Sequence, residues 1–461
     1  MARAMDTRGS ATVRRHAAYM SIVAHSLRFR ISNCSRRQAH SLPRLPGMPP
    51  APAPSRGPRF EPFRALRYAP GIDLDAVIAP PYDVLSDADV AALRARDPHN
   101  IVHADIPAGT DSTRYAASAH LLRDWQETGV LVRDEVPTLS IYRMRFVDEA
   151  GQRRELVGVL GGLEVVAEGA GQVLPHERTT PKASTDRLDL TRATATNLSP
   201  VWGLSLAQGL TAALAEPAEP MGSLVVDGVE HVVERVIDTD RIAAISAIIG
   251  ADDVLIADGH HRYGVARRYR DEMAEAKEPE TASGAGATLA FVGELVADQL
   301  AIDAIHRIVR GLTPAALREA LARDFELVPA PAAQPGPALL AELNRSGRLL
   351  LIESPEVATW LVPRPGAFDA VRALDGAWLE HTLAGTGAVL DYQHGVAEVL
   401  DVLHADPQDL AILIRPTSLE QIERTAREGL LMPPKSTFFT PKLRTGLVLR
   451  PLDEAGYVAT A

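Results

Sequence analysis

A short apolar segment that leads directly into a helix is the feature that most constrains how this chain can fold. Residues 254–257 read Val-Leu-Ile-Ala, Asp258 and Gly259 follow them, and the pattern predicts a helix over residues 260–276. Four consecutive apolar residues predict a short, buried strand. We therefore expect a strand inside a sheet and a helix that begins immediately after it.

Helices and strands are mixed along the chain up to residue 310. The patterns predict helices over residues 87–96, 113–127 and 239–249, and strands over 139–147, 154–166, 225–227, 231–237 and 287–296. Four of these strands form two hairpins, and strands do not alternate regularly with helices. The predicted fold class is therefore α+β or mixed α/β and not a doubly wound sheet.

The pattern changes after about residue 311. Helices are expected over residues 313–323, 374–383 and 418–428, and strands over 325–328, 348–352, 359–361, 410–415 and 443–450. We expect a disordered Arg- and Pro-rich extension over 1–58, with Met48 as an alternative start, a catalytic or phosphate-binding domain over 59–310 and a smaller α+β domain over 311–461. The segment Lys435-Ser436-Thr437 of the last domain is expected to return to the site.

Charge and cysteine content exclude several classes of protein. The formal net charge is −11; residues 1–47 contain nine Arg and one Asp, which is +8 and leaves −19 on the rest. An acidic body argues against DNA binding. Cys34 is the single cysteine, so the body has no disulfide framework, cysteine zinc site or thiol nucleophile. Without an apolar run of about 18 residues, we expect a cytoplasmic protein that does not enter a membrane.

The strand–helix junction has the chemistry of an anion site. A helix N-terminus presents free N–H groups, Gly259 lets a ligand approach the backbone, and Arg262 can bind a phosphate with two hydrogen bonds. Asp258 could orient Mg²⁺, accept a proton or cap the helix. His260 and His261 point about 100° apart, so one zinc ion rarely takes both. The alternative is a capped helix with solvated side chains.

Residues 174–206 form a second candidate. The stretch is rich in Pro, Thr, Asp and Arg and lacks periodicity, so we expect a long functional loop. Glu177 is a candidate general base, and Lys182 and Arg187 would neutralise phosphate charge. A solvated polar loop is the alternative. Lys435 or Lys442 could add a cation, and the stiff loop before Tyr82 could form a pocket wall.

Four motifs together resemble the domain-of-unknown-function family 1015 (DUF 1015), over about residues 60–452. The motifs are Ala79-Pro80-Pro81-Tyr82-Asp83-Val84, Leu174-Pro175-His176-Glu177, Asp258-Gly259-His260-His261-Arg262-Tyr263 and Met432-Pro433-Pro434-Lys435-Ser436-Thr437. This family has no settled activity, so the resemblance implies no function by itself.

The segment Asp258-Gly259-His260-His261-Arg262 is also similar to the motif of free serine kinases of the ParB/sulfiredoxin superfamily. That resemblance implies a ParB/sulfiredoxin-like N-terminal part with a mixed sheet, in which the strand–helix corner holds nucleotide phosphates. Asp258, His260, His261 and Arg262 would then contact phosphate or metal. Sulfiredoxins carry a catalytic cysteine at this corner, and this chain has none there, so sulfinic-acid reduction is excluded.

We therefore expect a phosphotransferase that acts on a small hydroxylated metabolite, with serine as one candidate, and that uses Mg²⁺ and a nucleotide. Expected catalytic residues are Glu177, Asp258 and His260, with Asp258 also the metal ligand. Expected phosphate-binding residues are Gly259, His261, Arg262, Lys182, Arg187 and Lys435, and expected substrate-pocket residues are Tyr82, Asp83, His176 and Asn197.

The alternatives are a non-catalytic regulatory protein that binds a nucleotide or phosphometabolite, and a metal-dependent phosphatase that uses His176, Asp258 and His260. The expected partners are a small-molecule substrate and a nucleotide, without DNA or membrane, and the oligomeric state stays open.

Overall fold

A nine-stranded mixed sheet carries the strand–helix junction. The computed structural model describes residues 57–176, 182–276, 284–433 and 435–453. The strands of the sheet are β1 (Phe60–Glu61), β4 (Leu139–Val147), β5 (Arg153–Glu164), β6 (Val173–Leu174), β8 (Val201–Ser205), β9 (Glu219–Val226), β10 (Val229–Val236), β11 (Val254–Asp258) and β12 (Ala287–Glu294). Their order is β6-β11-β8-β12-β5-β4-β10-β9, and β1 pairs with β5. Strand β8 runs parallel to β12 and antiparallel to β11, so the mixed class predicted from the sequence is confirmed.

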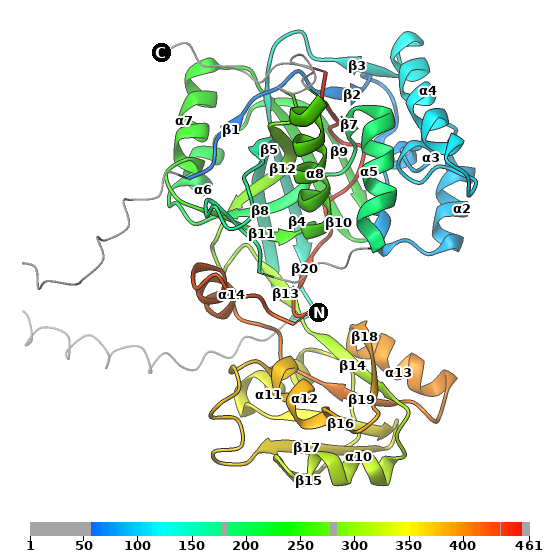
Figure 1. The fold of residues 1–461 in the computed structure, drawn as a ribbon, viewed down its shortest axis with the longest axis vertical. Helices are drawn as coiled ribbons and strands as arrows, with labels where there is room; N and C mark the ends of the chain where they lie inside the picture. Colours follow the sequence, from blue (N-terminus) through cyan, green and yellow to red (C-terminus); the bar gives the residue numbers. More distant parts are fainter. Residues whose placement is uncertain (1–56, 177–181, 277–283, 434, 454–461) are drawn as a thin grey trace, which may run out of the picture. The chain divides into compact units, whose positions relative to one another are not determined.

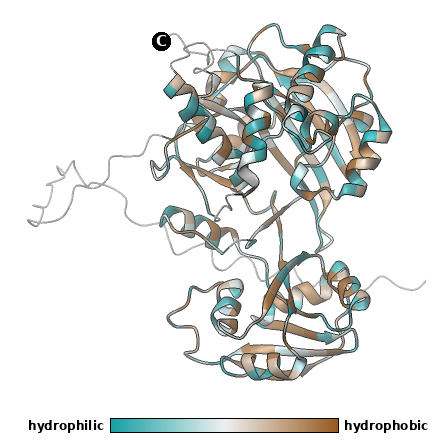
Figure 2. Cartoon of the chain, turned by 45° about the vertical axis from the view of Figure 1, so that its right-hand side comes forward, coloured by the Kyte–Doolittle hydropathy of each residue, from teal (hydrophilic) through white to brown (hydrophobic). Residues whose placement is uncertain are grey.

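Both faces of this sheet are buried. Along β4 the side chains alternate: Leu139 and Ile141 belong to one apolar cluster, and Tyr142 and Met144 belong to the other. This two-residue period is the geometry of a strand, in which successive side chains point to opposite faces. Figure 2 shows brown, hydrophobic colour on much of the strands, and both brown and teal on the helices around them.

Helices and short strands surround the sheet (Figure 1). The helices of this part are α1 (Leu74–Val77), the 3₁₀ turn η1 (Tyr82–Val84), α2 (Asp87–Arg96), α3 (Val102–Asp105), α4 (Thr113–Glu127), α5 (Lys182–Thr194), α6 (Leu210–Leu214), α7 (Thr239–Ile249) and α8 (His260–Ala276). Two-stranded sheets pair β2 (Leu66–Tyr68) with β3 (Leu131–Arg133), β7 (Thr196–Asn197) with β21 (Arg450–Pro451), and β13 (Ala301–Asp303) with β20 (Phe438–Thr440). Ser86 begins α2 with a reciprocal capping box, in which its side chain and that of Asp89 each bond to the other's backbone N–H.

A second, wholly antiparallel sheet of six strands follows in the order β15-β17-β16-β19-β14-β18. Its strands are β14 (Ile305–Arg310), β15 (Phe325–Ala330), β16 (Leu349–Ser354), β17 (Val357–Pro363), β18 (Val389–His394) and β19 (Leu410–Leu413). Helices α10 (Pro314–Leu321) and α12 (Asp375–Leu383) contribute to one apolar cluster of this sheet, and α11 (Pro337–Ser346) and α13 (Val396–Ala405) contribute to the other. The sequence patterns above include neither α11 nor α13.

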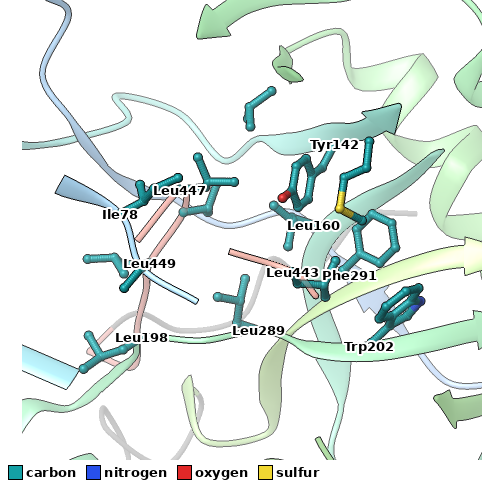
Figure 3. Close-up of a cluster of buried hydrophobic side chains, with 14 of the residues drawn as sticks. Ile78, Tyr142, Leu160, Leu198, Trp202, Leu289, Phe291, Leu443, Leu447 and Leu449 are labelled. Atoms are coloured by element: carbon teal, nitrogen blue, oxygen red, sulfur yellow. The ribbon is translucent and has the colours of Figure 1, made fainter. Parts of the chain in front are cut away.

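The end of the chain joins the core of the first sheet. Helix α14 (Leu419–Arg427) and the segment after it bury their apolar side chains in the cluster that contains Tyr142 and Phe291. Figure 3 shows Leu443, Leu447 and Leu449 among these residues. Residues 443–450 were expected to form a strand, but of these only Arg450 lies in one, the two-residue strand β21 (Arg450–Pro451). The apolar pattern there reflects burial of a core-filling segment, which forms isolated bridges from Leu449 to Leu66 of β2 and from Thr445 to Ala79.

The expected loop over residues 174–206 is a second correction, because it contains helix α5 and strands β7 and β8. Helix α5 has few apolar side chains, and ion pairs with other elements hold it. Arg187 pairs with Asp105 of α3 at 3.0 Å, and Arg192 pairs with Glu272 of α8 at 2.6 Å. A local pattern cannot predict a helix that depends on such partners. Within the described residues, none of the helices combines the length and apolar character needed to cross a bilayer.

Candidate functional site

The predicted junction is present where β11 ends and α8 begins. Strand β11 has an irregular register against β8 between Ile256 and Asp258, and Gly259 has a φ of +87°. A Cβ atom at Gly259 would lie 3.1 Å from the Arg262 guanidinium carbon and 3.3 Å from Val201 Cα. Only glycine adopts this backbone without strain and leaves room for both neighbours. The first helical bond joins the Tyr263 N–H to the Gly259 carbonyl, so the N–H groups of residues 260–262 belong to the N-terminus of α8.

Three charged side chains converge at this corner. Arg262 Nη2 donates to Asp258 Oδ2 at 2.8 Å, and Lys442 Nζ donates to Asp258 Oδ1 at 3.3 Å. Arg262 Nη1 also donates to the Pro200 carbonyl oxygen. The side chains of Arg262 and Lys442 are 9% and 16% exposed, and Asp258 is 26% exposed. Two cations thus face one carboxylate, which leaves a net charge of +1 on these three groups.

The electrostatics of Asp258 follow from its two partners. Burial alone raises the pKa of Asp258, but Lys442 and Arg262 together hold the pKa of this carboxyl well below its usual range. Asp258 is therefore ionised under all ordinary conditions. A carboxylate with such a low proton affinity is a poor general base. Its geometry instead suits an anchor that fixes the positions of Arg262 and Lys442.

His176, which is fully buried, and His260, which is half-buried, form a pair beside the corner, with ring centroids 4.7 Å apart. His176 Nδ1 donates to the Ile256 carbonyl at 2.7 Å, and His176 Nε2 accepts from the Thr437 hydroxyl at 2.9 Å. The His176 N–H donates to His260 Nε2 at 3.3 Å. Burial and the neighbouring His176 lower the pKa of His260 well below its usual range, so His260 is neutral at pH 7. A neutral His260 is therefore a poor proton donor at this pH, and His176 is held beside it by its hydrogen bonds.

A cavity of about 60 Å³ lies beside the corner. Its lining includes Arg262, Arg187, Tyr82, Asn197 and Asp105. The Arg187 guanidinium lies 4.3 Å from the centre of the Tyr82 ring. Burial raises the pKa of Asp105, although its partner Arg187 opposes the shift. Helices α5 and α8, which carry the two arginines, lie side by side (Figure 1).

The structure thus brings together only part of the set of residues expected from the sequence. Asp258, Gly259, His260 and Arg262 form the corner, His176 is buried behind it, and Tyr82, Arg187 and Asn197 line the cavity. Asp83 lies 4.0 Å from Arg262 and is 44% exposed. His261 is half-buried in the first turn of α8. Glu177 and the side chain of Lys182 lie outside the described part of the chain.

The lysine at the corner is Lys442, whereas Lys435 is exposed. From the sequence, Lys435 is the expected phosphate-binding lysine and Lys442 only a further possible cation, because both follow a proline-rich stretch and no local pattern separates them. Asp105 was missed altogether. It sits in the four-residue helix α3 without a motif around it, so no local signal could have identified it.

Asp258 does not fit the role of a metal ligand. Both of its oxygens face a cation, so a divalent ion on this carboxylate would lie against two positive charges. His176 has both ring nitrogens engaged. Within the described ranges, no three His, Cys, Asp or Glu side chains gather as a metal site. The geometry therefore argues against a phosphatase built on His176, Asp258 and His260.

Comparison with known proteins places the chain in a family. A family model described as a protein of unknown function (DUF1015) matches residues 60–377, which is more than half of the chain. The chain belongs to the DUF1015 family. Among curated proteins none matches it.

Solved structures with a detectable likeness are remote. A free serine kinase mutant in complex with ADP is 13% identical, with 58% of this chain and 84% of that chain covered and a TM-score of 0.33. SbnI with a C-terminal truncation from Staphylococcus aureus is 13% identical, with 64% and 87% covered and a TM-score of 0.35. A conserved hypothetical protein from Pyrococcus furiosus is 11% identical, with 58% and 87% covered and a TM-score of 0.32. Likenesses of this size assign no activity to this chain.

Proposed function

We propose that the chain is a phosphotransferase that moves a phosphoryl group from a nucleotide to a small hydroxylated metabolite, with the phosphates at the β11–α8 corner. The observation that carries the proposal is the convergence of Arg262 and Lys442 on Asp258 in front of a helix N-terminus. The ParB/sulfiredoxin-like relationship of this part, suggested by the Asp258–Arg262 motif, belongs to the same proposal.

The chemistry of the corner suits phosphoryl transfer. Such a reaction needs the phosphates to be positioned and their charge to be neutralised, and little covalent chemistry from the protein. The helix N-terminus supplies N–H donors and a partial positive charge, and Arg262 and Lys442 supply two cationic side chains. Asp258 keeps both cations in place before the ligand arrives, which reduces the cost of ordering them on binding. Any magnesium ion that arrives on the nucleotide is part of the substrate.

Proton removal from the acceptor hydroxyl is assigned to Glu177. Asp258 is too weak a base, and His176 and His260 are engaged with each other and with the backbone. Glu177 follows His176 directly in the sequence. The backbone N–H of His176 donates to His260 Nε2, and its carbonyl oxygen accepts from the Met432 N–H. In Glu177→Gln we expect unchanged nucleotide affinity and a turnover reduced at least a hundredfold.

Calorimetry with ATP, ADP and AMP tests the binding step. We expect wild-type protein to bind at least one of these nucleotides, and Lys442→Met to lower that affinity at least tenfold because one charge-assisted contact is lost. The matched control is Lys435→Met, in the same segment but exposed, which should bind like wild type. Wild-type protein that binds none of the three nucleotides would end the proposal.

A regulatory protein that binds a nucleotide without turnover is the second candidate. The observation in its favour is that every carboxylate described at the corner and in the cavity already faces a cation. Binding without transfer, with Glu177→Gln indistinguishable from wild type in every assay, would favour this candidate over the enzyme.

A further inference from the structure

Phe438 lies between the corner lysine and the second sheet. Lys442 Nζ lies 4.2 Å from the centre of the Phe438 ring. The same ring stacks on the imidazole of His394, with centroids 4.4 Å apart and ring planes 11° from parallel. His394 is the last residue of β18 in the six-stranded sheet, whereas Lys442 pairs with Asp258 of β11. One aromatic ring therefore connects the second sheet to the corner.

The register of the strands explains why the two rings meet. Strand β20 pairs with β13, and its Phe438 lies opposite Asp303. Strand β18 pairs with β14, and its His394 lies opposite Ile305. Only Ala304 separates β13 from β14, and positions two residues apart along a strand face the same side. The partners of Asp303 and Ile305 are therefore placed next to each other, on one face.

The carboxylates around Lys442 do not fix its position by themselves. Its ammonium donates to Asp258 Oδ1 at 3.3 Å, which is long for a charged pair. Burial raises the pKa of Asp303, and the charge of Lys442 opposes this shift, so Lys442 also feels a second carboxylate. A lysine ammonium is a point charge on a flexible stem, without the fixed geometry of a guanidinium. The face of an aromatic ring attracts such a cation and restricts where it lies.

Phe438 is not a core residue. It is half-buried and His394 is exposed, whereas the neighbouring Phe439 is 1% exposed and belongs to the apolar cluster of the first sheet. Substitutions at Phe438 and His394 can therefore test these contacts without opening the core.

We propose that Phe438 and His394 are positioning residues for Lys442, and that the six-stranded sheet sets the affinity of the corner for phosphate through them. This inference rests on the proposed function in one respect, because it takes Lys442 to be a phosphate ligand. Phe438 acts through Lys442 and contacts no substrate itself.

Calorimetry with ATP, ADP and AMP tests the role of the ring. We expect Phe438→Leu to lower nucleotide affinity at least fivefold, because leucine does not attract a cation. Phe438→Tyr keeps the ring and should bind within twofold of wild type. In the Lys442→Met background the effect of Phe438→Leu should disappear, since the ring acts through that lysine. An equal loss in both backgrounds would overturn the proposal.

The contribution of the second sheet is tested at His394. We expect His394→Ala to weaken nucleotide binding two- to threefold, and His394→Phe, which keeps a stacked ring, to bind like wild type. The matched control is Tyr392→Ala, which removes an exposed ring from the same strand; the Tyr392 ring packs against Arg307 instead. Equal affinities of the His394→Ala and Tyr392→Ala proteins would show that the sheet does not act through this stack.

Reductive methylation of lysines, read by mass spectrometry, tests the position of Lys442 without a nucleotide. Lys442 is 16% exposed, and we expect its methylation to be at least threefold faster in Phe438→Leu than in wild type or Phe438→Tyr. Exposed Lys435 is the internal reference and should react equally in all three proteins. An unchanged rate at Lys442 would overturn the positioning role. Wild-type protein that binds no nucleotide would instead end the proposed function and leave the methylation result standing.

Discussion

Asp258 is the residue on which the corner depends. Its two oxygens hold Arg262 and Lys442, and both cations are largely buried. If one charged partner of a buried ionic group is removed, the remaining charges are left unpaired. The cost of these unpaired charges to the stability of the fold is larger than the net stabilisation that the intact group provides. The same arrangement explains why Asp258 is a better anchor than a base or a metal ligand.

We expect Asp258→Asn to lower the free energy of unfolding by about 2–3 kcal/mol in urea denaturation at pH 7. The two cations would then face each other across a neutral amide. Asp83→Asn is the control, because Asp83 lies 4.0 Å from Arg262 and is 44% exposed, so its loss should cost less than about 0.5 kcal/mol. Equal effects of the two substitutions would contradict the anchor role of Asp258.

At the scale of elements, helix α8 contributes to both the β11–α8 corner and the cavity beside it. Its first turn belongs to the corner, and its next turn lines the cavity. Gly259 permits the helix to start directly after β11. In Gly259→Ala the new Cβ would require a left-handed backbone and would displace Arg262. We expect a loss of about 1–2 kcal/mol of stability and at least tenfold weaker nucleotide binding, measured by urea denaturation and calorimetry.

Gly264→Ala provides the comparison within the same helix. A Cβ at Gly264 meets no atom within 4 Å, and alanine is the better helix former. We therefore expect this variant to be stabilised by up to about 1 kcal/mol with nucleotide affinity unchanged. A Gly259→Ala protein that behaves like Gly264→Ala would show that the corner tolerates a side chain and that its shape is not needed.

The elements that sequence patterns missed share a physical cause. Helix α5 contains only two buried leucines, Leu188 and Leu190, and relies on ion pairs with α3, α4 and α8. By contrast, α7 places Ile242, Ile245 and Ile249 on one face, and its predicted bounds agree with the structure. Periodicity predicts a helix when the helix is held in place by its own apolar face, as α7 is. It fails when the helix is held mainly by ion pairs with residues far away in the sequence, as α5 is.

At the scale of the whole molecule, buried neutral histidines make stability sensitive to acid. Burial, with help from Arg307 and His394, lowers the pKa of His306 to about 3, and His306 is 1% exposed. A histidine with a lowered pKa contributes its full stability above its unfolded pKa of about 6.5, and this stability is lost as the pH falls below that value. His231, which accepts or donates a 2.7 Å hydrogen bond with Tyr142, has its pKa lowered to about 4 by burial and adds to the effect.

When the pH falls from 7 to 5, we expect the free energy of unfolding of the wild type to drop by about 2 kcal/mol more than that of His306→Gln. Urea denaturation at both pH values measures the two drops. Glutamine can still accept the bond from the Ile414 N–H, so the substitution removes the titration and keeps the contact. Carboxyl groups that titrate in this range are present in both proteins and cancel in the comparison. Identical pH dependence in the two proteins would show that His306 is accessible to protons in the folded state.

The sequence by itself determined the features whose signals are local: the mixed class of fold, the buried strand β11, the glycine after it and the start of α8 with Asp258 and Arg262 one turn apart. Only the tertiary structure decided that Lys442 and not Lys435 completes the corner, that Arg187 and Asp105 share a cavity with Arg262, and that the last segment of the chain fills the core. The reason is physical: a strand, a turn and a helix start are set by neighbouring residues, whereas the pairing of charges far apart in the sequence depends on which surfaces the whole fold buries together.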